Sequence, residues 1–252
     1  MPLRLATFNI RNVNDRYQER APLLGQAFAA IDADVICLQE VHFSEDVNDA
    51  QDLFLASHLP ARNYRSLDSR SERSPDFGNA ILVSAGEVQA HEELRLSRGR
   101  SAHRVLLALP GARVIWVVNT HLHHKPEEPA VRAEQAAAIL QWMAEAPGAD
   151  AAIVAGDFNT PPFEPAYDLM TRARYRSAML EANGAEPPVT WPSGIQAPTM
   201  DTEGDPNCLD YIWLTGDVRV VSATLAADAA HPTDPTLYPS DHFALVAELD
   251  WS

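Results

Sequence analysis

Short apolar runs separated by polar or proline-containing segments recur along the chain and predict many β-strands. Pro110-Gly111 lies between two of these runs and predicts a hairpin. The alternation of residues 87–94 leads us to expect that this strand pairs with strand 78–84. The predicted strands are residues 3–10, 35–40, 62–67, 78–84, 87–94, 104–109, 113–121, 151–159, 209–214, 218–225 and 243–249.

Apolar residues at helical spacing predict helices at residues 20–31, 45–59, 130–146 and 163–173. Residues 180–207 and 228–239 have little periodicity, and we expect the first of them to be a functional loop region. We find no repeat and no linker that would divide the 252 residues. The chain is therefore expected to form a single α/β domain over residues 1–252.

Polar side chains follow many of the buried runs. The most distinctive case is Gly156-Asp157-Phe158-Asn159, where an acid and an amide end a strand of small apolar residues. Residues two apart in a strand share a side, so Asp157 and Asn159 are predicted to act on one bound group. A helix cap ahead of Pro161 is the alternative for these two residues. The full set of such strand-end residues is Asn9, Glu40, Asn79, His121, Asp157, Asn159, Asp210, Asp241 and His242.

Carboxylate and amide oxygens without cysteine ligands suit Mg²⁺ or Mn²⁺. The two cysteines, Cys37 and Cys208, are too few for a disulfide framework, and we expect both to be reduced. Zinc is not favoured, because His123 and His124 follow the strand of His121 and lack a spaced third imidazole. The sequence thus predicts a magnesium or manganese site.

The net charge of −16 weakens any interpretation as a non-specific nucleic-acid binder, and Lys125 is the only lysine. The net charge therefore does not favour nucleic acid as a partner, although it does not exclude it. The chain has one run of basic residues. We expect it to be a solvated face balanced by Glu92 and Glu93; the alternative is a clamp for a second phosphate. This run consists of Arg95, Arg98, Arg100 and Arg104.

The N-terminal residues lack a charged segment followed by a long apolar one. We therefore expect no signal peptide, no membrane span and a cytoplasmic location. We also expect a monomer.

Seven ordered blocks carry a resemblance to a known family. They are Thr7-Phe8-Asn9-Ile10, Leu38-Gln39-Glu40-Val41, Gly78-Asn79-Ala80-Ile81-Leu82, Asn119-Thr120-His121-Leu122, Gly156-Asp157-Phe158-Asn159, Leu209-Asp210-Tyr211-Ile212 and Ser240-Asp241-His242. In these seven blocks and their order, the chain resembles the endonuclease/exonuclease/phosphatase superfamily, whose fold is that of deoxyribonuclease I. The resemblance implies a four-layer α/β/β/α sandwich of two mainly antiparallel mixed sheets.

The resemblance also implies roles for the strand-end residues. Glu40 would be the principal ligand of a catalytic Mg²⁺ or Mn²⁺, with Asn9 beside it and Asp241 sharing the coordination. Asp157 would orient or deprotonate the attacking water. The groups at the phosphate would be Asn159, which holds it, His242, which is oriented by Asp210, and His121, a second donor.

The chemistry that follows is hydrolysis of a phosphodiester or phosphomonoester by in-line attack of an activated water. Its substrate is a phosphate ester of unassigned identity. The alternative is a DNA or RNA endonuclease or exonuclease of the same fold. A binding module that has lost the chemistry is not favoured, because none of the metal or histidine blocks is missing.

Overall fold

Two six-stranded sheets form the centre of the molecule, and the computed structural model describes residues 2–46, 50–72, 74–198, 200 and 205–251. The first sheet has the order β11-β12-β1-β2-β4-β3 and the second β5-β6-β7-β8-β10-β9. The first is built from β1 (Leu3–Asn9), β2 (Val35–His42), β3 (Arg65–Arg70), β4 (Phe77–Val83), β11 (Arg219–Ala226) and β12 (Ala244–Asp250). The second is built from β5 (Glu87–Arg95), β6 (Ser101–Leu109), β7 (Arg113–His121), β8 (Ala151–Asp157), β9 (Arg176–Ser177) and β10 (Asp210–Gly216).

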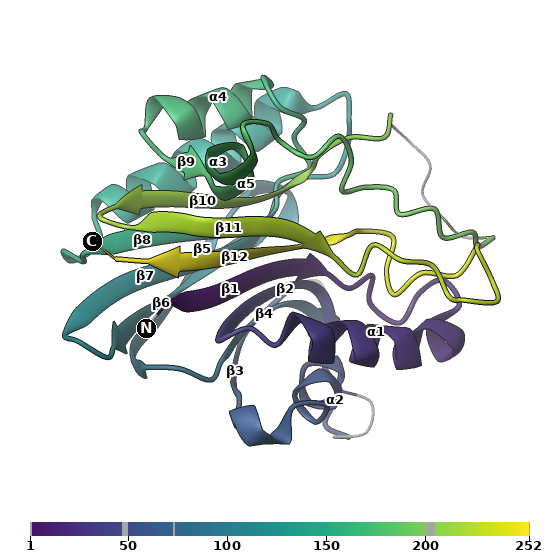
Figure 1. Ribbon diagram of the computed structural model, residues 1–252. Coiled ribbons are helices and arrows are strands. Elements are labelled where there is room, and N and C mark those ends of the chain that lie inside the picture. The colour runs from purple at the N-terminus through teal and green to yellow at the C-terminus, as the bar shows by residue number, and fades with distance from the viewer. Residues whose placement is uncertain (1, 47–49, 73, 199, 201–204, 252) are drawn as a thin grey trace.

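Helices cover the outer face of each sheet (Figure 1). On one side lie α1 (Tyr17–Ile31) and α2 (Gln51–Ala56), and on the other lie α3 (Pro129–Ala144), α4 (Pro165–Arg172) and α5 (Ala178–Asn183). Short 3₁₀ turns are η1 (Pro60–Arg62) and η2 (Ser97–Gly99). This helix, sheet, sheet, helix order is the expected four-layer α/β sandwich, and the sheets are mixed as expected.

Within the described residues, three apolar clusters separate the four layers. The first lies between the sheets and includes Leu5 of β1 and Ile153 of β8. The second joins Trp116 of β7 to Ile139 of α3, and the third contains Phe28 of α1. Strands buried on both faces have continuous apolar runs rather than alternating ones, which explains the starts of β2 and β8.

Each sheet contains one parallel pair of strands joined by a helix. The pairs are β1 with β2, connected through α1, and β7 with β8, connected through α3. Parallel strands end at the same edge of a sheet, so β1 and β2 bring Asn9 and Glu40 together, while His121 and Asp157 are paired in register at the ends of β7 and β8. The two packed sheets place these edges next to each other.

Several of the predicted elements differ from those in the structure. Strand 87–94 was expected to pair with strand 78–84, but β5 pairs with β6 in the second sheet, because both edges of β4 are already occupied by β2 and β3. The helix predicted at residues 45–59 is confined to Gln51–Ala56 among the described residues, and 47–49 lie outside them. The hairpin of β6 and β7 is confirmed.

Two further observations concern chemistry that the composition raised. Cys37 and Cys208 are free thiols and both are buried. Among the helices that the structure describes, none combines the length and the apolar character that a membrane span requires.

Candidate active site

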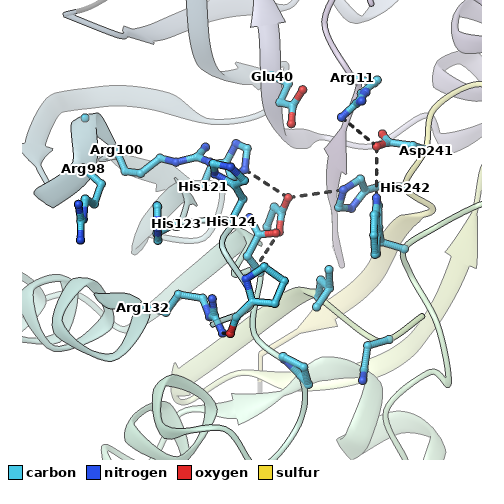
Figure 2. Close-up of a pocket in the computed structure, with 18 of the residues that line it drawn as sticks. Arg11, Glu40, Arg98, Arg100, His121, His123, His124, Arg132, Asp241 and His242 are labelled. Atoms are coloured by element: carbon cyan, nitrogen blue, oxygen red, sulfur yellow. Dashed lines mark hydrogen bonds and ion pairs between the residues drawn. The ribbon is translucent and has the colours of Figure 1, made fainter. Parts of the chain in front are cut away.

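A cavity of about 960 Å³ opens where the strand ends of the two sheets meet (Figure 2). Most of the predicted site residues line it: Glu40, His121, Asp157, Asn159, Asp241 and His242. Asn9 and Asp210 lie directly behind these and hydrogen-bond to them. Asn79, by contrast, is a buried strand residue in register with Ser69 and is not among the lining residues.

Glu40 reaches the cavity because β2 is irregular there. The strand does not end at Glu40, as predicted, but continues to His42, with a register shift between Leu38 and Val41. Glu40 has a φ of 55°, which is unusual for a residue with a side chain. Such bulges redirect a side chain out of the normal alternation and are common next to active sites.

Asn9 links two acids through its amide nitrogen. Its Nδ2 donates to Glu40 Oε1 at 3.2 Å and to Asp157 Oδ2 at 2.9 Å. Its Oδ1 accepts from the backbone N–H of Arg11 at 3.0 Å. Asn9 therefore lies beside Glu40, and its oxygen keeps one lone pair that the backbone does not use; its part in holding a metal stays a prediction.

Asp157 is the most heavily contacted acid of the site. Its Oδ2 lies 3.4 Å from His121 Nε2 and 3.6 Å from His242 Nε2. Burial raises the pKa of Asp157 to about 7, opposed by the charge of His242 and assisted by that of Asp210. Gly156 makes this placement feasible, because a Cβ there would lie 2.0 Å from the Thr120 carbonyl oxygen.

Asn159 lines the cavity for a different reason from the one predicted. Strand β8 ends at Asp157, so Asn159 stands in a turn, with a φ of 49°, rather than two positions along a pleat. Its backbone N–H donates to Asp157 Oδ1 at 2.9 Å, and its Nδ2 donates to the Leu122 carbonyl at 3.2 Å. The helix-cap alternative is wrong, because α4 has Glu164 at its N-cap.

Asp210 and His242 form a buried pair. Asp210 Oδ2 lies 2.9 Å from His242 Nδ1 and accepts from Thr190 Oγ1 at 2.6 Å. Burial alone would lower the pKa of His242, but Asp210, Asp157 and Asp241 raise it to about 10. The charged imidazole therefore lies between two carboxylates, and the potential ligand atoms of Asp157, Asp210 and His242 all fall within 4.8 Å of one another.

Asp241 is held by Trp191, which lies in the loop region 180–207, and by Arg11, which the sequence did not single out. Arg11 Nη1 lies 3.3 Å from Asp241 Oδ2, and Trp191 Nε1 donates to the same oxygen at 3.3 Å. Burial lowers the pKa of Arg11, but Asp241 and Glu40 raise it overall. Arg11 stands two residues after Asn9 in the same polar segment, which is the only signal that could have identified it.

His121 lines the cavity next to Asp157. Burial, together with the charges of Arg100 and His242, lowers its pKa well below the usual value, so the imidazole is neutral. Its Nδ1 is buried and finds no hydrogen-bond partner in the described part of the chain.

The opposite wall of the cavity carries four residues that the sequence raised without assigning them to the site, and Arg132, which it did not raise. It carries Arg98, Arg100, His123, His124 and Arg132 (Figure 2). The basic run had been expected to be a solvated face balanced by Glu92 and Glu93. Arg95 does pair with Glu93 and Arg104 with Glu92, but the Arg104 side chain is buried and stacks on two tryptophans.

A model of the Endonuclease/Exonuclease/phosphatase family matches residues 6–242, from β1 to the histidine before β12. The chain belongs to this family. Its members are hydrolases that act on phosphate esters. YbhP of Escherichia coli strain K12 is 27% identical over 265 residues, which cover 98% of this chain and 95% of YbhP. Human Nocturnin is 25% identical over 264 residues, but these cover 94% of this chain and 59% of Nocturnin.

Solved structures show the same fold. An endonuclease/exonuclease/phosphatase from Bacteroides vulgatus has a TM-score of 0.79 and 23% identity, with all of both chains covered. The human Nocturnin catalytic domain with a bound sulfate anion has a TM-score of 0.77 and 22% identity, covering 100% of this chain and 95% of that one. TDP2 of Caenorhabditis elegans, truncated, has a TM-score of 0.75 and 17% identity, covering 100% and 98%.

Proposed function

We propose that this protein is a divalent-metal-dependent phosphoesterase that hydrolyses a phosphodiester or phosphomonoester by in-line attack of water. The observation that carries the proposal is the position of Asp157. This buried acid lines the cavity, contacts His242, and is linked through Asn9 to Glu40. A potential base, a cationic imidazole and a carboxylate suited to a metal therefore surround one space.

Glu40 fits a metal best among the residues present. Its carboxylate lines the cavity, and Asn9 donates to it from behind. Mg²⁺ commonly takes one or two protein carboxylates, with water and substrate phosphate filling the other positions. Asp241 is the second carboxylate of the proposed site, although Arg11 and Trp191 already contact one of its oxygens. When bound, Mg²⁺ or Mn²⁺ would neutralise charge on the phosphoryl oxygens.

The set of Asp157, Asp210 and His242 fits a metal less well. Both nitrogens of His242 face carboxylates, and the contact of Nδ1 with Asp210 is a normal hydrogen bond. An ion coordinated there would displace that bond. We therefore assign the set to proton handling and charge stabilisation.

In this mechanism Asp157 orients and deprotonates the attacking water, since its raised pKa suits a general base near neutral pH. His242 stabilises the negative charge that builds on the phosphoryl oxygens, and Asp210 holds it in position. The neutral His121 and the amide of Asn159 contact the phosphate as further polar groups. No side chain needs to form a covalent intermediate.

The test is a panel of phosphomonoesters, phosphodiesters, DNA and RNA, assayed with Mg²⁺, with Mn²⁺ and with EDTA. We expect hydrolysis of at least one substrate that EDTA abolishes and that Asp157→Asn reduces at least about 100-fold. The proposal fails if no member of the panel is hydrolysed with either metal.

A nuclease remains the alternative within the same family and is tested by the same panel. The net charge of −16 works against a long polyanionic substrate. The cytoplasmic location and the monomeric state stay predictions.

A further inference from the structure

Five basic side chains gather on the wall of the cavity that faces Glu40 and Asp241 (Figure 2). They come from the 3₁₀ turn η2 and the residue after it, from the segment that follows β7, and from helix α3. We call this group the cationic wall. Its members are Arg98, Arg100, His123, His124 and Arg132.

Arg100 has no ion pair within the part of the chain that the structure describes. Its Nη2 lies 3.1 Å from His124 Nδ1. Burial lowers the pKa of Arg100, and the more distant charges of Glu40 and Asp157 only partly oppose this effect. Arg100 is only partly buried and lines the cavity, so its guanidinium, which has no carboxylate partner among the described residues, can bind an anionic ligand there.

Arg132 is also incompletely satisfied. Its side chain is 1% exposed, and its terminal nitrogens contact the Lys125 and Pro126 carbonyls and Glu164. Its Nε, however, is buried and has no hydrogen-bond partner among the residues that the structure describes.

One histidine of the same cavity shares this property. Among the described residues His121 Nδ1 is buried without a hydrogen-bond partner, whereas His123 Nε2 lies 3.3 Å from Glu128 Oε2. Most buried polar atoms in folded proteins are hydrogen-bonded, so atoms left unpaired around one cavity need an explanation. The several acceptor oxygens of a phosphate group would supply the missing partners.

The size of the cavity supports the same conclusion. Its volume of about 960 Å³ is near the upper end of pockets that hold whole organic ligands. A phosphate bound at His242 and Asp157 would occupy only one side of it. A long polynucleotide would also extend over a surface whose net charge is −16, whereas a small ligand would remain within the cavity.

We propose that the cationic wall binds a second phosphate group of the substrate, which is therefore a small molecule carrying two separated phosphates. This inference rests on the proposed function, because it takes the first phosphate to lie at Asp157 and His242. The two ends of the cavity then have different tasks: one carries out hydrolysis, and the other selects for the second phosphate.

The inference is tested by calorimetric titration with two ligands, adenosine 3′,5′-bisphosphate and adenosine 5′-monophosphate. All proteins carry Asp157→Asn to block turnover, and Mg²⁺ is present throughout. Arg98→Gln and Arg100→Gln remove one charge each from the wall. Arg172→Gln is the matched control, because Arg172 is exposed on α4 and pairs only weakly with Asp168, at 3.6 Å.

We expect the unmodified wall to bind the bisphosphate at least about tenfold more tightly than the monophosphate, as one or two charge-assisted hydrogen bonds would give. Arg100→Gln should reduce this ratio to within about threefold of unity, Arg98→Gln should lower it in part, and the control should preserve it.

Equal affinity for the two ligands before any arginine is changed would overturn the inference. So would an Arg100→Gln variant that weakens both ligands equally, since Arg100 would then contact the first phosphate. The titration does not depend on catalysis. A protein that hydrolyses nothing in the panel but still prefers the bisphosphate would refute the proposed function alone.

Discussion

Replacing Asp210 by asparagine removes one charge from the buried pair with His242 and changes almost no volume. The two groups approach to 2.9 Å, between Asp210 Oδ2 and His242 Nδ1. At an effective dielectric constant of about 20, this separation corresponds to an attraction of about 6 kcal/mol. A neutral amide retains a hydrogen bond worth about 1–2 kcal/mol. The difference of about 4 kcal/mol predicts a loss of roughly 10³-fold in kcat.

The assay is steady-state hydrolysis of the best substrate of the panel at saturating metal. We expect kcat to fall while KM changes by less than about threefold, because Asp210 acts through His242 and does not contact the substrate. Asp217→Asn is the matched control, since it makes the same substitution just beyond the other end of β10, at an exposed position. Thermal unfolding shows whether the variant is folded. A folded Asp210→Asn enzyme that keeps more than about a tenth of the wild-type kcat would refute this reasoning.

Three further predictions concern stability and metal dependence. Arg20→Met should lower the free energy of unfolding by about 4 kcal/mol in urea titrations, because the fully buried Arg20 guanidinium donates to several carbonyls, including those of Ile10 and Pro239, which would lose their donor. An unchanged unfolding midpoint would contradict it. His103 is buried, and burial lowers its pKa to about 3, so below pH 6.5 the unfolded chain takes up a proton that the folded protein does not. Stability should then fall by up to about 1.4 kcal/mol per pH unit as pH decreases from 6.5 towards 3, and the decline should be shallower in His103→Gln. Glu40→Gln should raise the Mg²⁺ concentration needed for half-maximal activity at least about tenfold, and an unchanged metal requirement would remove Glu40 from the metal site.

Local pattern was sufficient to predict most strands, the class of the fold and the polar residues at the strand ends. Burial on both faces demands uninterrupted apolar runs, as in β8, and the chemistry of a site demands polar groups where such runs stop. The order of the blocks around Asn9, Glu40, Asp157, Asp210 and His242 led from there to the family and its sandwich of four layers.

Only the tertiary structure decided which groups meet. Strand β5 joins the second sheet because β4 has no free edge, and no property of residues 87–94 reveals that. The bulge that directs Glu40 into the cavity depends on the pairing of β2 with β4. The ion pair between Arg11, near the start of the chain, and Asp241, near its end, forms only through folding. Arg100 and Arg132 line the same wall of the cavity because α3 packs on the second sheet. Contacts between residues so far apart in the sequence produce no hydrophobic periodicity from which they could be predicted.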